Sequence, residues 1–162
     1  MGTAVATCPK GSEAVSGGFA SPNSADQGRD ATYPFTSKRV GDRKWKVRAI
    51  NNDRQHSRKL KAFAYCDKRE PGLDVESDQV AVPDNGKRTL DLGCRHGDKP
   101  LSGGYASTLQ PGGRGAAFAF TSRPISGDRW RVSAFGTMAG GGAKVARRRA
   151  IAGTLTAFVY CK

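Results

Sequence analysis

The chain has 162 residues, including 21 glycines and 8 prolines, with 37% hydrophobic and 25% charged residues and a formal net charge of +13. The glycine content is too high for a helical protein and the apolar content too high for a disordered one. No run approaches the roughly 18–20 apolar residues of a transmembrane helix, so we expect a soluble chain. The first residues lack the apolar core of a signal peptide, and we expect them to belong to a mature domain with an initiator methionine.

The first strand-like segment, residues 8–21, recurs later in the chain. It opens with Cys8-Pro9-Lys10-Gly11 and closes with Ser16-Gly17-Gly18-Phe19-Ala20-Ser21, and residues 94–107 follow the same pattern 86 positions later. A glycine pair inside a strand-like run indicates a bulge or a close approach of two backbones. A loop that cradles a nucleotide phosphate is the sharper alternative, but no helix follows the glycines.

The next repeated element is an alternating segment at residues 44–49, matched 85 positions later by residues 129–134. Apolar and basic residues alternate in both copies: Trp45, Val47 and Ala49 against Lys44, Lys46 and Arg48, and Trp130, Val132 and Ala134 against Arg129, Arg131 and Ser133. This period of two is typical of a strand with one buried face. We therefore expect Trp45 and Trp130 to be equally buried anchors, one in each copy.

The last repeated element, residues 60–66, matches residues 155–161 at an offset of 95. Both of its faces are apolar, so we expect each of these segments to be a central strand. The change of offset places an insertion of ten residues between Ala134 and Leu155, in a run rich in glycine and arginine. We expect this run to be a surface loop, and the segment from Lys144 to Ile151 lacks the N-cap and apolar stripe of a helix.

These elements predict an all-β protein with about five short strands in each copy. We expect two tandem, pseudo-equivalent β units, sandwich-like or prism-like, each with one disulfide. The predicted boundaries are residues 1–66 for the first unit, 67–86 for an acidic linker and 87–162 for the second unit. The linker either lies across a basic face of the protein or is solvated, and the sequence does not separate these alternatives.

The four cysteines, Cys8, Cys66, Cys94 and Cys161, bracket the two copies in the same way. Three pairings are possible, and the repeat favours Cys8–Cys66 with Cys94–Cys161, each stabilising by about 4 kcal/mol in the chain-entropy model. A zinc site is the alternative, but no pair has C-x-x-C spacing and only His56 and His96 could assist. We predict no metal and no cofactor, and disulfides indicate a secreted protein.

The charge is uneven along the chain. Residues 1–66 carry a net +7, residues 67–86 a net −4 and residues 87–162 a net +10. Such a field attracts anionic partners, although high charge can also serve solubility alone. The candidate binding residues are the outward basic residues of the tryptophan segments and those of the insertion: Lys44, Lys46, Arg48, Arg129, Arg131, Lys144, Arg147, Arg148 and Arg149. Most aromatic residues fall at repeat-matched strand positions, so we expect only nonspecific nucleic-acid adhesion at low salt.

Catalytic patterns are weak. The histidines stand at non-equivalent positions, and no nucleophile elbow of the G-x-S-x-G type occurs. The acids that stand out are Glu13, Asp42, Asp91 and Asp128. Of these, Asp42 and Asp128 recur in a Gly-Asp turn, where an Asx-type hydrogen bond explains them. We predict that the protein is not an enzyme.

The repeat resembles a unit found in many secreted proteins of high-GC Gram-positive bacteria. Copy one carries its residues at Cys8, Gly11, Gly17, Gly18, Tyr33, Pro34, Trp45, Val47, Tyr65 and Cys66, and copy two at Cys94, Gly97, Gly103, Gly104, Trp130, Val132, Tyr160 and Cys161. Copy two departs from the pattern at residues 117–120, where Ala-Phe-Ala-Phe replaces Thr-Tyr-Pro-Phe. The resemblance implies secretion from an actinobacterial host, and it brings no shared activity.

Two hypotheses for the function follow from these patterns. The first is a secreted cationic binding module that docks on an anionic cell surface or on a partner protein of an extracellular assembly. The second is a secreted inhibitor or toxin-like effector that acts through the exposed loop at residues 136–150.

Overall fold

The structure is a computed structural model that describes residues 1–21, 32–51, 57–68, 72–110, 115–125, 127–138 and 150–162. Within these ranges the chain forms eleven β-strands and no helix. It divides into two compact units, residues 1–73 (unit 1) and 74–162 (unit 2). Each unit holds one disulfide, Cys8–Cys66 and Cys94–Cys161, and both have a Cα–Cα distance of 5.7 Å. The predicted all-β fold of two disulfide-bearing units is therefore confirmed.

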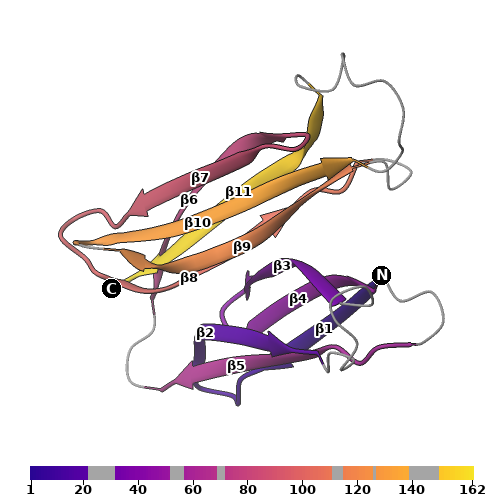
Figure 1. Cartoon of the computed structure of the whole chain (residues 1–162). Coiled ribbons are helices and arrows are strands. Elements are labelled where there is room, and N and C mark those ends of the chain that lie inside the picture. The colour runs from indigo at the N-terminus through magenta and orange to yellow at the C-terminus, as the bar shows by residue number, and fades with distance from the viewer. Residues whose placement is uncertain (22–31, 52–56, 69–71, 111–114, 126, 139–149) are drawn as a thin grey trace. The chain divides into compact units, whose positions relative to one another are not determined.

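Unit 1 contains two antiparallel sheets. Its strands are β1 (Gly2–Thr7), β2 (Glu13–Ala20), β3 (Thr32–Val40), β4 (Lys44–Asn51) and β5 (Lys61–Asp67). One sheet has the order β1-β4-β3, and β2 pairs with β5 in the other (Figure 1). The apolar residues of β4, Trp45, Val47 and Ala49, are all buried, as their alternation predicted.

Unit 2 contains the same two sheets with one additional strand. Its strands are β6 (Asp74–Pro83), β7 (Lys87–Gly93), β8 (Pro100–Ser107), β9 (Gly115–Ile125), β10 (Arg129–Met138) and β11 (Ile151–Cys161). One sheet has the order β7-β10-β9, and β11 lies between β8 and β6 in the other. The core between the sheets is built from buried residues of all six strands: Val82, Leu92, Tyr105, Ala117, Val132, Ala134, Leu155, Ala157, Val159 and Cys161.

The segment predicted as an acidic linker, residues 67–86, is largely a strand. Residues 74–83 form β6, which runs antiparallel to β11, so the domain boundaries predicted at 66 and 87 are corrected to a single division after residue 73. Acidic residues concealed this strand, but Val80 and Val82 lie two residues apart on one face, with Val82 fully buried and Val80 packed against the core. β6 has no counterpart among the described strands of unit 1.

The two terminal strands of the repeat differ in their surroundings. β11 is central, as predicted, because β6 and β8 flank it. β5 was also predicted to be central, and this was wrong: in the part of the chain that the structure describes, it pairs with β2 alone. Two apolar faces therefore did not distinguish a central strand from an edge strand.

The glycine pair of the repeat provides space for the tryptophan. A Cβ atom at Gly17 would overlap with the indole of Trp45, and one at Gly103 would overlap with the indole of Trp130. Each indole also donates a hydrogen bond of 3.0 Å from Nε1 to a serine hydroxyl, Ser37 in unit 1 and Ser122 in unit 2. The predicted close backbone approach is confirmed, and its purpose is packing.

The tryptophans are not equally buried. Trp45 is 1% exposed, whereas Trp130 is half-buried at the edge of its core. Arg39 lies directly across from Trp45 on β3, with its side chain held by an ion pair of 2.8 Å to Glu13. The residue across from Trp130 is Pro124, which is too short to cover the indole in the same way.

Candidate functional site

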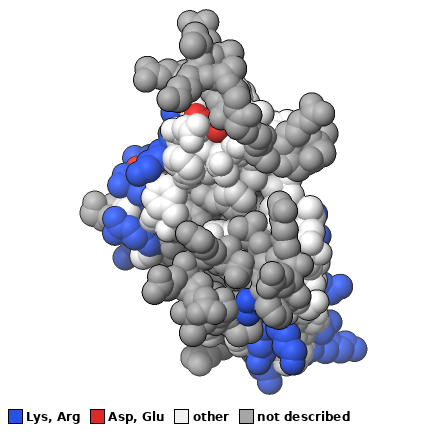
Figure 2. Space-filling view, turned by 45° about the vertical axis from the view of Figure 1, so that its right-hand side comes forward, with Lys and Arg blue, Asp and Glu red and all other residues white. Residues whose placement is uncertain are grey.

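A basic row crosses the outer face of the sheet β1-β4-β3. Because Trp45 and Val47 point inward, the intervening Lys46 points to the opposite face. Lys46 lies directly between Val5 on β1 and Lys38 on β3. Two lysine side chains therefore lie next to each other on neighbouring strands of this face. Figure 2 shows that Lys and Arg side chains gather in groups on the face it presents, with few Asp or Glu among them.

The equivalent row in unit 2 is compensated by an acid. Arg131 lies between Asp91 on β7 and Arg123 on β9. It binds the carboxylate of Asp91 with two hydrogen bonds, of 2.7 Å from Nε and 2.6 Å from Nη2. These bonds, helped by the positive charges of Arg131 and Arg129, hold the pKa of Asp91 below its ordinary value of 3.8. Copy one has Val5 where copy two has this acid.

The predicted binding residues therefore fall into three groups. Lys44 and Lys46 lie on the outer face of β4, and the row contains Lys38 in addition. Three arginines have roles within their units: Arg131 and Arg129 bind the side chain and the carbonyl of Asp91, and Arg48 stacks 4.9 Å above the ring of Phe35. The remaining four, Lys144, Arg147, Arg148 and Arg149, lie outside the described residues, as does most of the loop at 136–150.

Lys38 was missed by the sequence analysis. It follows a bulge between Pro34 and Thr36, which shifts the register of β3 against β4 and interrupts the alternation that would have identified its face. The neighbouring Arg39 then points inward to Glu13. The offset of 85 residues that relates Lys38 to Arg123 was the available signal, because Arg123 and Arg131 are both basic.

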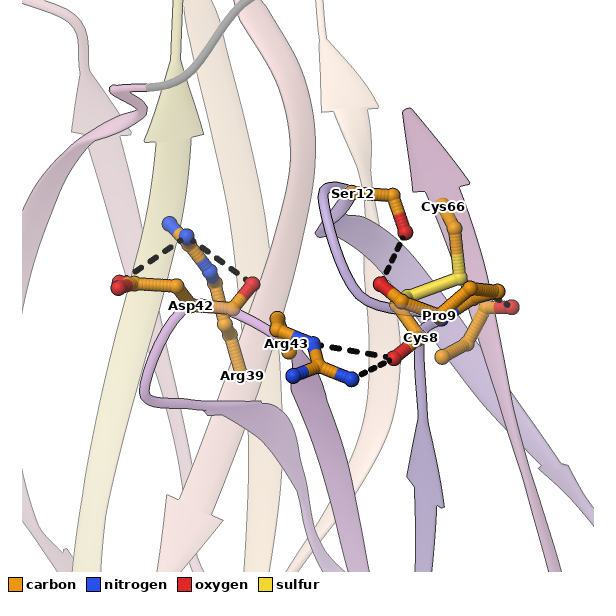
Figure 3. The surroundings of a disulfide bond; sticks show 8 residues. Cys8, Pro9, Ser12, Arg39, Asp42, Arg43 and Cys66 are labelled. Carbon is orange, nitrogen blue, oxygen red and sulfur yellow. Dashed lines mark hydrogen bonds and ion pairs between the residues drawn. A yellow bond between two sulfur atoms is a disulfide. The ribbon is translucent and has the colours of Figure 1, made fainter. Parts of the chain in front are cut away.

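A depression of about 400 Å³ lies beside the disulfide of unit 1, lined by Gly11, Ser12, Glu13, Asp42, Arg43, Asp67 and Lys68. Figure 3 shows the guanidinium of Arg43 reaching the carbonyl oxygen of Cys8, to which it donates hydrogen bonds of 3.1 and 2.7 Å. Ser12 donates to the carbonyl of Pro9 at 2.8 Å, and Glu13 is held by Arg39. These contacts hold the turn that carries the disulfide. We therefore assign a structural role to the residues that line the depression.

The candidate catalytic acids are also engaged in local contacts. Glu13 and Asp42 both approach Arg39, at 2.8 and 3.5 Å, and Asp91 binds Arg131. The carbonyl oxygen of Asp42 accepts a hydrogen bond of 2.8 Å from the amide of Ala14, which ties the Gly-Asp turn to β2. Across the described ranges, no group of three or more His, Cys, Asp or Glu side chains could hold a metal ion.

The ion pair of unit 2 predicts a dependence of stability on pH. Asp91→Asn should lower the free energy of unfolding at pH 7, because the folded state binds the ionised carboxylate in preference. A carboxyl group whose pKa is lower in the folded state stabilises above its unfolded pKa, and this stabilisation is lost as pH falls through the folded pKa. Urea denaturation of both proteins at pH 7 and in acid checks this: the difference should disappear in acid. An equal difference at both pH values would contradict it.

No described segment forms a helix long and apolar enough to cross a membrane. No family model, no curated protein and no solved structure matches this chain.

Proposed function

We propose that the protein is a secreted, non-enzymatic binding module that docks on an anionic polymer of a cell surface through the outer face of unit 1. The basic row of Lys38 and Lys46, with Lys44 beside it, is the contact surface. The single observation that carries this proposal is the difference between the two rows. The same position is Asp91 in unit 2, where it neutralises Arg131, and Val5 in unit 1.

The row offers adjacent positive charges to a polymer. Lys38 and Lys46 lie in direct cross-strand register, so a polyanion laid along this face would contact both ammonium groups. Lysine ammonium groups are compact and hydrated, which suits contact with phosphate or carboxylate groups spaced along a flexible polymer. The two disulfides support secretion, because such bonds persist in oxidising compartments.

A salt-gradient experiment tests this function. The variant Lys38→Gln/Lys46→Gln should elute from an anionic polysaccharide or an isolated cell-wall matrix at lower salt than the parent protein. The matched control is Lys87→Gln/Lys99→Gln, which changes the net charge equally in unit 2. Attraction between exposed charges is screened by salt, so a local site shows a larger shift than the control. Equal shifts of the two variants would mean that total charge alone governs retention.

The insertion in copy two is tested in the same experiment. Neutralising Arg147, Arg148 and Arg149 together should reduce the salt dependence if the loop contributes three adjacent guanidinium groups to the contact. A triple variant that elutes with the parent protein excludes this loop from the binding surface. The inhibitor hypothesis depends on the same loop, most of which lies outside the described residues.

A further inference from the structure

Unit 1 has a free strand edge where unit 2 has an additional strand. The terminal strands β5 and β11 are equivalent in sequence, with Phe63 matching Phe158 and Tyr65 matching Tyr160. β11 is paired on both sides, to β8 and to β6 over residues 74–83. β5 is paired on one side to β2, and no described strand pairs with its other edge. On that edge, the backbone N–H and C=O groups of β5 form no β-ladder with another strand in the described part of unit 1.

The side chains of β5 are more exposed than those of β11, as expected for a strand that has one neighbouring strand fewer. Each residue from Lys61 to Cys66 is more exposed than its equivalent in β11, from Thr156 to Cys161. Tyr65 is 64% exposed, whereas Tyr160 is 2% exposed. Phe63 and Phe19 of the same two-stranded sheet are also exposed, at 38% and 42%. A two-stranded sheet with apolar side chains in water is marginal without a further strand or another covering element.

The strand β6, which pairs with β11, indicates which residues a strand at this edge would carry. β6 is acidic, with Asp74, Glu76 and Asp78, and it lies on a strongly basic unit. Its register places Val75 across from Tyr160 and Gln79 across from Thr156. Transferred to unit 1, the same register places one partner residue across from Tyr65 and another across from Lys61.

We propose that the free edge of β5 binds an extended, acidic segment of a partner polypeptide as an added antiparallel strand. The fitting segment carries an apolar residue across from Tyr65, as Val75 does across from Tyr160, and a polar residue across from Lys61, as Gln79 does across from Thr156. Main-chain hydrogen bonds along β5 supply affinity, and these two side-chain positions supply selectivity. The acidic character follows from the net +7 of residues 1–66 and from the acidic strand that occupies the equivalent position in unit 2.

A peptide that copies β6 provides the probe. The full-length protein is mixed with a synthetic peptide of residues 74–83, capped at both ends, and amide hydrogen exchange is followed residue by residue. Exchange of the amides of β5 should slow at least about tenfold, because amides in a stable ladder are protected. The control peptide has the same sequence with N-methyl groups on alternate residues, which keeps the charge and the side chains but prevents pairing.

The possible outcomes separate the alternatives. Protection of β5 by the parent peptide, absent with the methylated one, supports the added strand. Equal effects of both peptides would reduce the interaction to charge attraction, and protection of β11 alone would mean exchange with the native β6; either result overturns the proposal. Protection of β5 that rises with protein concentration without peptide would assign the edge to a second copy of the chain, which also overturns it. Since Lys38 and Lys46 lie on a different strand pair, retention on the anionic polymer is an independent measurement.

Discussion

Replacing Trp45 with alanine should lower the free energy of unfolding by about 3–5 kcal/mol, the usual cost of deleting a large buried aromatic side chain. Trp45 is 1% exposed and is one of the largest buried side chains in the described structure. The substitution removes its contacts with the β2 backbone at Gly17 and leaves the hydroxyl of Ser37 without the indole donor. The disulfide between Cys8 and Cys66 links β5 to the segment after β1, which limits how far the two sheets can move together to fill the space.

Trp130→Ala is the matched variant. It should lower the free energy of unfolding by less, about 1–3 kcal/mol, because a half-buried ring buries less apolar area on folding. Urea denaturation followed by far-ultraviolet circular dichroism measures both losses without depending on the tryptophans themselves. The difference between the variants reports the covering effect of the Arg39–Glu13 ion pair, which unit 2 lacks at the equivalent positions. Equal losses would contradict the unequal burial of the two rings.

Gly17→Ala should destabilise unit 1 by about 3 kcal/mol, at the upper end of the usual range for overpacking a core. The added methyl group would overlap with the indole of Trp45 and would lie 2.5 Å from the carbonyl oxygen of Phe63. The backbone of β5 cannot yield easily, since Ala64 and its neighbours are paired to β2 in a fixed register. The new methyl group can therefore be accommodated only if the tryptophan leaves its position.

Gly18→Ala is the control for this prediction, because a Cβ atom at Gly18 meets no atom within 4 Å. The variant should be neutral or slightly stabilising, by up to about 1 kcal/mol, through a smaller entropy of the unfolded chain. Thermal unfolding of the two single variants compares them directly. Similar melting temperatures would show that the close approach at Gly17 is not needed, and Gly103→Ala offers the same test in unit 2.

Local patterns predicted most of the elements correctly. The alternation of residues 44–49 placed Trp45 and Val47 inside, and the glycine pair indicated a close approach before its partner was known. The same local patterns predicted the residues of the candidate site less well. Arg129 and Arg131 have the same alternation as Lys44 and Lys46, yet Arg131 binds Asp91, which lies 40 residues earlier in the chain. A pattern within one strand carries no information about the charge on the neighbouring strand.

The sequence by itself determined the repeat and the strand periodicity, and it favoured the correct disulfide partners, because two copies of one pattern place their cysteines at equivalent positions. The tertiary structure decided the role of residues 74–83, the edge position of β5 and the placement of Lys38 directly across from Lys46. Each of these depends on which strands lie side by side. Strand pairing joins residues far apart in the chain, so the same apolar or basic pattern is central in one unit and exposed at an edge in the other.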